Sequence, residues 1–492
     1  MEKKNLKQIF TIENLLYFFL ILCPILDVSS FLFRNKFQTN FSISTFIRPI
    51  IPIVAIIYIF FKDNIKKKLT LAGLIYAIYA LIHLILYKKI ATSCAYGNVI
   101  REAQYIVNYT FMIMNLFIYL YIFVFREKDK NIKNNNIYKL RKVLLITFTI
   151  YIALMYIAII TGTSSYTYGE DKMGYKGWFE SGNSVGAIMI LLIFAVIPFI
   201  EKENDKRIRI WSLIDIVLSG IYLMLFLGTR VGLFGFILVV LIYIVFKVIC
   251  NLFNSKKINR KAIEFGICSF TIILVLVGIF GSTTLSRRKL LKEREATIYD
   301  SNIGESAHVT GDILELVNKI EKHEVPESYM SYEMQRSIID LYNYNNAHHV
   351  PYTSMRTIQL VYHTELVKNQ RDLILMLFGN GYMSHITELI FEMEVPAFLY
   401  NFGILGFIMY FIPFLTISVY AFYNIIKNYK KVDSLTVMST LALCFAIGIS
   451  FFAGYTFFNS STMMIIIALC IFATNNINSN KSKDKENNIV ER

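Results

Sequence analysis

The sequence predicts an all-α fold, a polytopic bundle of about 12 membrane-spanning helices with a helical cap on its outer side. Of the 492 residues, 55% are hydrophobic and only 17% are charged, whereas water-soluble domains are about 45–50% apolar and about 25% charged. Apolar runs of roughly 18 to 25 residues recur along the chain, which is the length that a helix needs to cross a bilayer. This length also excludes a barrel of weakly alternating strands of about ten residues.

Twelve apolar windows are candidate spans. They lie at 9–33, 41–61, 69–87, 103–125, 143–162, 183–200, 210–228, 231–250, 263–281, 396–422, 435–457 and 461–474. They divide the chain into a first helical block over 1–281, a cap over 282–395, a second block over 396–474 and a tail over 475–492. The tail is rich in Asn, Ser, Lys and Glu, so we expect it to be disordered.

The distribution of basic residues predicts a multi-pass protein of the cell membrane with both termini in the cytoplasm. With this orientation, 30 of the 50 Lys and Arg residues lie in the termini and the short inner loops, as the positive-inside rule requires. The net charge of +15 is therefore mostly a matter of membrane topology and does not indicate a nucleic-acid partner. The first apolar run is too long for a cleavable signal peptide, so we expect it to remain as a helix.

The segment 282–395 is the one part of the chain with the composition of a water-soluble protein. Its 114 residues include 11 basic and 16 acidic side chains, and it is too long for an unstructured connection. Helical patterns at 311–322 and 354–370 and an apolar stretch at 373–378 predict a small helical cap. Four apolar residues of the second pattern share one helix face, which we expect to lie on the membrane domain. They are Met355, Ile358, Tyr362 and Leu366.

Three arginines on the outer side are candidates for binding an anion. Arg48 and Arg230 lie near the outer ends of spans, where a charged side chain is costly unless it reaches the interface or a partner. Arg356 lies in the cap. A guanidinium binds phosphate oxygens through two parallel hydrogen bonds and stays charged in a poorly hydrated cleft. The alternatives are interfacial anchors for Arg48 and Arg230 and a solvated surface charge for Arg356.

Two carboxylates precede the tenth span and would lie at the outer membrane surface. Glu392 and Glu394 are candidate general bases, since a carboxylate held in a cleft can take a proton from a sugar hydroxyl. The alternative is a polar helix start whose acids complement the positive end of the helix dipole. The histidines lack the spacing of a zinc site, so no metal or other cofactor is expected. Only His385 is kept as a candidate acid or base.

Several short motifs complete the pattern. They are Thr229-Arg230 at the start of a span, Ser354-Met355-Arg356 in the cap, Phe378-Gly379-Asn380-Gly381-Tyr382, Gly403-Ile404-Leu405-Gly406, and Gly177-Trp178-Phe179 with Asn183. With the span layout and the long outer segment, these motifs make the chain resemble the O-antigen ligase and polysaccharide polymerase family of membrane glycosyltransferases. The resemblance implies a fold of the GT-C type and a polyprenyl-diphosphate-linked oligosaccharide as substrate. Trp178, Asn183 and His385 would then contact the sugar. The alternative for Trp178 is a tryptophan anchored at the membrane interface.

The ligase branch of this family carries a histidine eleven positions before the first glycine of the Gly-x-x-Gly element. Counting back from Gly403, that position holds Glu392, and the next holds Met393. The resemblance therefore favours a polymerase over a ligase that transfers finished polymer.

As the resemblance implies, the expected reaction is an inverting transfer on the outer face. Glu392 or Glu394 would act as the base, and Arg230, Arg356 and Arg48 would stabilise the departing diphosphate. Membrane lipid and other polysaccharide export proteins are candidate partners. A flippase of lipid-linked saccharide is the alternative from another class, although paired broken helices and an internal repeat are missing.

Overall fold

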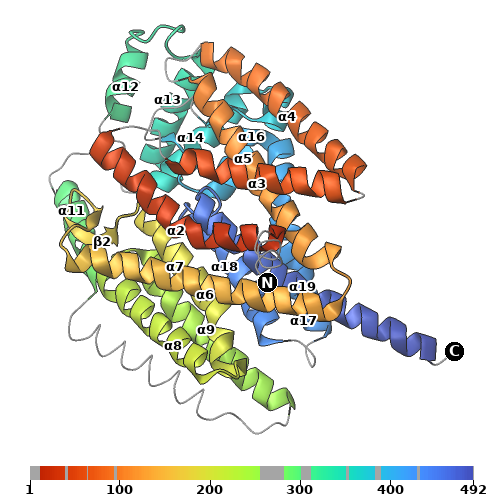
Figure 1. Cartoon of the computed structure of the whole chain (residues 1–492). Coiled ribbons are helices and arrows are strands. Elements are labelled where there is room, and N and C mark those ends of the chain that lie inside the picture. The colour runs from red at the N-terminus through yellow and green to blue at the C-terminus, as the bar shows by residue number, and fades with distance from the viewer. Residues whose placement is uncertain are drawn as a thin grey trace.

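The computed structural model describes residues 11–38, 43–63, 65–92, 97–254, 282–300, 312–350, 354–382, 389–428 and 433–490, and it is almost entirely helical (Figure 1). The first block comprises α2 (Ile12–Phe37), α3 (Ile43–Lys62), α4 (Lys66–Thr92), α5 (Val99–Leu120), η1 (Tyr121–Arg126), α6 (Lys130–Ile160), α7 (Gly182–Lys202), α8 (Lys206–Ile221), η2 (Tyr222–Phe226) and α9 (Arg230–Asn254). Here η1 and η2 are π-helical turns that continue α5 and α8. The cap region comprises α11 (Thr283–Asp300), α12 (Asp312–Glu321), α13 (Tyr332–Ala347), α14 (Met355–Gln370) and α15 (Leu373–Phe378). The second block comprises α16 (Glu394–Tyr410), α17 (Ile412–Lys427), α18 (Ser434–Phe452) and α19 (Ser460–Val490).

Two helices form the centre of the bundle. Every residue from 184 to 199 in α7 is buried, as is every residue from 461 to 473 in α19. A helix that is apolar on all sides must be covered on all sides, and α7 packs against α6, α8, α9, α18 and α19. Nearly all large side chains of these two stretches therefore belong to the core.

The predicted spans are mostly helical where the structure describes them, but the count of twelve is not confirmed. The predicted span at 435–457 is too long, because α18 ends at Phe452 and a loop follows. Seven of the described helices are long and apolar enough to cross a membrane, and α16 with α17, bent by 46°, would make an eighth. The predicted spans at 231–250 and 461–474 correspond to shorter apolar helices. The predicted span at 263–281 lies outside the described residues.

One short β-hairpin interrupts the helices. Strands β1 (Ser165–Tyr168) and β2 (Met173–Gly177) pair antiparallel between α6 and α7. The apolar windows gave no indication of it, because the hairpin lies in a polar loop. It packs beside the turn after η2, where the Thr167 hydroxyl donates to the Leu227 carbonyl at 2.7 Å.

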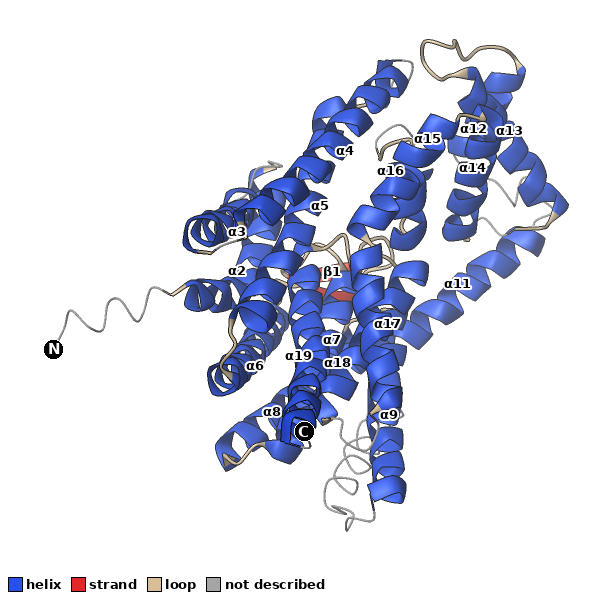
Figure 2. Cartoon of the chain, turned by 90° about the vertical axis from the view of Figure 1, so that its right-hand side faces the viewer, coloured by secondary structure: helices blue, strands red, loops and turns tan. Residues whose placement is uncertain are grey.

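Helices α12, α13 and α14 lie beside α16, at the end of the molecule opposite α8 and α9, and α11 runs obliquely toward them (Figure 2). The predicted helices at 311–322 and 354–370 are confirmed as α12 and α14, and the stretch at 373–378 forms α15. The expected contact of the α14 apolar face with the membrane domain is wrong for three of its four residues, while Met355 lines the cavity between the cap and the helical blocks. Ile358, Tyr362 and Leu366 instead pack into a separate core shared with α12 and α13, because α13, which the sequence did not predict, covers that face.

Helix α19 continues to Val490 and projects away from the bundle (Figure 1). This differs from the disordered tail expected at 475–492. The stretch from 475 to 490 contains neither proline nor glycine, so it holds none of the residues that strongly break a helix.

Two glycine motifs that are distant in the sequence meet in the structure. Gly379 and Gly403 both have positive φ angles, of 86° and 70°. A Cβ atom on Gly403 would lie 2.4 Å from the Leu377 carbonyl oxygen, and one on Gly379 would lie 2.1 Å from that of Asn401. The amide of Gly381 also donates to Asn401 at 2.9 Å. Only glycine allows the two backbones to approach so closely, and this contact bends α16 and positions the turn before it.

Replacing Gly403 by alanine should therefore destabilise the fold by about 1–3 kcal/mol, because the new methyl group meets backbone and the φ angle is strained. Thermal unfolding of the purified protein in detergent measures the change. Gly448→Ala is the matched control, since Gly448 lies in α18 and no atom comes within 4 Å of the place that the new methyl group would take. It should gain about 0.5–1 kcal/mol from better helix propensity. Equal effects of the two substitutions would contradict this account.

Candidate functional site

A cavity of about 940 Å³ lies where the two helical blocks meet the cap. Its walls come from α2, α3, α5 and α14, from the hairpin and the start of α7, and from the segments that precede α16 and α19. Five charged side chains line it, namely Asp27, Arg34, Arg48, Glu180 and Glu392. A concave site with a few convergent polar groups is the usual form of a ligand site.

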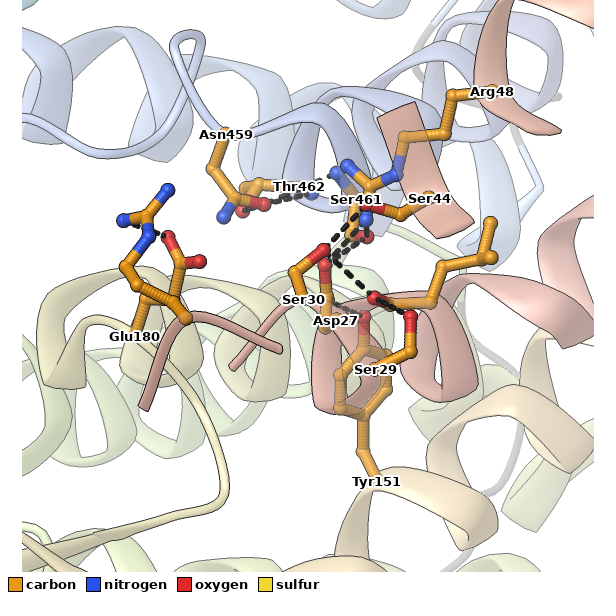
Figure 3. Close-up of polar contacts among 12 residues, drawn as sticks. Asp27, Ser29, Ser30, Ser44, Arg48, Tyr151, Glu180, Asn459, Ser461 and Thr462 are labelled. Atoms are coloured by element: carbon orange, nitrogen blue, oxygen red, sulfur yellow. Dashed lines mark hydrogen bonds and ion pairs between the residues drawn. The ribbon is translucent and has the colours of Figure 1, made fainter. Parts of the chain in front are cut away.

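At one side of the cavity, a polar cluster surrounds the carboxylate of Asp27 (Figure 3). Arg48 Nη2 donates to Asp27 Oδ1 at 2.5 Å, and the Ser461 hydroxyl donates to the same oxygen at 2.9 Å. The Tyr151 hydroxyl donates to Oδ2 at 2.7 Å. Four helices thus contribute to one cluster. Such a charged pair is tolerated in a poorly hydrated region because each charge has a partner and further hydrogen bonds.

Two arginines of the cavity keep donors for a ligand. The hydrogen bonds described for Arg48 all use Nη2, which leaves Nη1 without a hydrogen bond among the described residues. Its Nε is buried and has no hydrogen-bond partner there either. Arg34 pairs with Glu180 at 3.1 Å, but the two side chains are 58% and 40% exposed. An exposed pair of this kind is weak, so an anionic ligand could replace Glu180 as the partner of Arg34.

Glu392 lies in the wall of the cavity that the cap contributes. Three residues on one face of α14 hold its segment: Arg356 Nε lies 3.3 Å from Glu392 Oε2, the Gln359 side-chain oxygen accepts from the Glu392 amide at 3.0 Å, and His363 Nε2 donates to the Leu389 carbonyl at 3.0 Å. The spacing of 3 and 4 residues places these side chains on the same helix face. Helix α14 therefore positions the carboxylate.

Glu394 is not among the residues that line the cavity. Its carboxylate is fully buried and accepts hydrogen bonds from three consecutive amides, those of Thr456, Phe457 and Phe458, at 2.6–2.8 Å. These bonds fasten the loop between α18 and α19 to the start of α16. Of the two predicted bases, only Glu392 is placed to meet a substrate in the cavity.

The turn from Gly379 to Tyr382 is held by a buried pair in the first block. His83 Nδ1 donates to the Phe378 carbonyl at 2.6 Å, and its Nε2 lies 2.8 Å from Glu102 Oε1. Glu102 Oε2 accepts from the Tyr382 amide at 2.7 Å. Burial raises the pKa of the Tyr382 phenol well above its ordinary value, so the ring enters the cavity wall with its hydroxyl protonated.

The three predicted arginines do not gather in one place. Arg48 lines the cavity, and Arg356 contacts it through Glu392. Arg230 is exposed at the first residue of α9 and is not part of the lining. The preceding residue, Thr229, is buried, and its hydroxyl accepts from the Gly232 amide at 3.1 Å. The Thr-Arg motif therefore caps a helix beside the cavity.

Of the predicted sugar contacts, Asn183 lines the cavity and Trp178 does not. The Trp178 indole donates to the Thr163 hydroxyl at 3.0 Å, outside the lining. His385 lies outside the described residues. In the parts of the chain that the structure describes, no three His, Cys, Asp or Glu side chains are grouped to hold a metal.

Several residues of the site were missed by the sequence reasoning. Asp27 had a signal of its own, since an acidic residue inside an apolar run is rarely without a function or a partner. Arg34 resembles Arg48 in lying near the outer end of a span. Gln359 lies 3 residues after Arg356 and His363 lies 4 residues after Gln359, so helical periodicity predicts that they share its helix face. The loop at 454–459 had no signal, because only the fold brings it to Glu392.

Comparison with known proteins agrees with this architecture. The model of the family described as O-antigen ligase like membrane protein matches residues 10–476, which is nearly the whole chain. No curated protein and no solved structure matches the chain.

Substituting the two neighbouring glutamates by glutamine should separate their roles. Glu394→Gln should lower the free energy of unfolding by about 2–3 kcal/mol, because glutamine offers a donor where three amides need acceptors. Glu392→Gln should change it by less than about 1 kcal/mol, since both side chains of its ion pair keep about 40% of their surface in contact with solvent. Thermal unfolding in detergent compares the two variants. If Glu392→Gln were as unstable as Glu394→Gln, the assignment of a structural role to Glu394 alone would be wrong.

Proposed function

Because the chain belongs to the O-antigen ligase-like membrane protein family, we propose that it is a polysaccharide polymerase of the cell membrane. It would join lipid-diphosphate-linked oligosaccharide repeat units on the outer membrane face. The family indicates a membrane enzyme of polysaccharide assembly, and the charge distribution of the loops supports the orientation.

One observation carries the proposal: a carboxylate and two arginines line the same cavity. Glu392 lies on the cap side, while Arg48 and Arg34 come from the first two helices. A transfer from a lipid diphosphate needs both kinds of group, a base for the attacking hydroxyl and positive charge for the leaving group. Arginines supply that charge in this proposal, so the mechanism requires no metal ion.

The proposed step is a single displacement at the anomeric carbon of the donor sugar. The hydroxyl oxygen of the acceptor sugar forms the new glycosidic bond, and its proton passes to Glu392. The bond between the anomeric carbon and the diphosphate oxygen breaks, and its electron pair leaves with the lipid diphosphate. Arg48 and Arg34 would stabilise the negative charge that develops there. Direct displacement inverts the anomeric configuration.

A ligase that transfers finished polymer and a flippase of lipid-linked saccharide remain the competing functions. Glu392 stands where the ligase branch carries histidine, which supports the polymerase. The arrangement of Glu392, Arg356 and Gln359 favours chemistry over transport, because a pure transporter needs no positioned base. The pool of lipid-linked saccharide in cells distinguishes the three functions.

Glu392→Gln in a complemented deletion strain should abolish long surface polysaccharide and leave single lipid-linked repeats. Loss of a general base lowers the rate by about 10²–10⁴-fold. Gel analysis of chain length and of the lipid-linked pool measures the effect. Glu315→Gln is the matched control, since Glu315 is an exposed acid in α12. Long chains stranded on lipid would identify a ligase, repeats retained on the inner face would identify a flippase, and unchanged chains would exclude Glu392 as the base.

Arg48→Lys tests the leaving-group side of the cavity. Lysine keeps a positive charge beside Asp27 but loses the planar guanidinium, so chain extension should fall by about 10²-fold. Membrane preparations supplied with lipid-linked repeats give the rate. Arg336→Lys in α13, where the arginine side chain is 60% exposed, should leave the rate unchanged. A wild-type rate for Arg48→Lys would remove Arg48 from the mechanism.

A further inference from the structure

Tyr455 has an unusual backbone conformation next to the proposed base. Its φ angle is 62°, and the preceding Gly454 has a φ angle of 67°. A glycine is required at 454 because there is no room for a side chain: a Cβ there would lie 1.8 Å from the Glu392 carbonyl oxygen. No such contact explains a tyrosine at 455. A bulky residue with positive φ is strained, and glycine or asparagine would adopt the same conformation more easily.

The surrounding structure enforces this conformation from both sides. On one side, Gly454 abuts the backbone of Glu392. On the other, the amides of Thr456, Phe457 and Phe458 are bound by the Glu394 carboxylate. Strain that is imposed in this way is concentrated at binding and catalytic sites, so the tyrosine side chain should have a use that a glycine could not serve.

The side chain of Tyr455 lines the cavity and is 44% exposed. Burial of part of the phenol, with a smaller contribution from the nearby Glu392 carboxylate, raises its pKa. Its hydroxyl makes no hydrogen bond within the described ranges of the chain. A ring placed in this way keeps much of its surface and its hydroxyl available to a ligand.

Further aromatic rings line the same part of the cavity. Tyr105 and Tyr382 stack with ring centroids 4.7 Å apart, and Phe458 meets Tyr382 edge to face at 5.7 Å. Side-chain amides of Asn108, Gln359 and Asn459 also line the cavity. Aromatic faces pack against the C–H faces of sugar rings, while amides bond the hydroxyls. This combination of apolar walls and a few polar groups is suited to a saccharide.

We propose that Tyr455, with the stacked pair Tyr105 and Tyr382, forms a saccharide-binding subsite beside Glu392. This inference rests on the proposed function and refines it: the ring bound there is the acceptor sugar, because its hydroxyl must reach the base. The subsite is separate from the cluster at Arg48, which would hold the diphosphate. It also replaces Trp178 as the aromatic contact for the sugar.

Tyr455→Gly tests the subsite through two quantities. Relief of strain should preserve or raise the stability, whereas loss of the ring should weaken saccharide binding. The variant should unfold at the same or a higher temperature than the wild type, because glycine adopts the positive φ without strain. Its affinity for saccharide should nevertheless fall about tenfold through loss of one aromatic face. Tyr455→Phe should retain most of the affinity. The probe is lipid-linked repeat extracted from the deletion strain and titrated onto the full-length protein in detergent.

His323→Gly is the matched control. His323 also has a positive φ angle, of 58°, but is exposed after α12 and does not line the cavity. This variant should show the same relief of strain and unchanged binding. Unchanged binding by Tyr455→Gly, or a clear drop in its unfolding temperature, would overturn the subsite. Chain length in cells reports separately on the proposed function. If the wild-type protein did not restore long chains to the deletion strain, the polymerase would be refuted, while the titration would still decide the subsite.

Discussion

The candidate site depends on the carboxylate of Glu394, which binds three consecutive amides of the loop before α19. Each of the three amides finds an acceptor in the same carboxyl group, and burial prevents water from competing for these bonds. These bonds join the start of α16 to a loop about sixty residues later in the chain. Because Gly454 lies directly against Glu392, the same bonds define one wall of the cavity and the position of Tyr455.

Glu392 itself is held from the opposite side by the cap. Arg356, Gln359 and His363 act from one helix face, so a small movement of α14 would shift the carboxylate. The cap helices have their own apolar core, which makes α14 a firm support. The proposed base lies on a short irregular segment that α14 holds directly and that leads into the start of α16. Rigid support of this kind is what proton transfer at a defined distance requires.

The pairing of Arg48 with Asp27 has a related effect on the other side of the cavity. An unpaired guanidinium at this depth would be costly, and the carboxylate offsets its charge while orienting Nη2. The pair leaves other guanidinium donors for a ligand. In the proposed reaction, a lipid diphosphate would engage these donors without breaking the pair, and the more exposed Arg34 would add its charge as the ligand binds. The proposed anion-binding groups and the proposed base come from separate elements, so the cavity lies between them.

Hydrophobic length and charge distribution determine the helical membrane fold, because a bilayer accepts few other solutions. The same sequence reasoning proposed Arg48 and Glu392, since polar groups beside apolar runs are conspicuous, and the family resemblance added Asn183; all three line the cavity. It could not separate Glu392 from Glu394, two residues apart, because their roles follow from which loop packs against each. It also could not find Tyr455, whose significance lies in a backbone angle. Tertiary structure decided these points, since the cavity forms only where segments distant in the chain pack together.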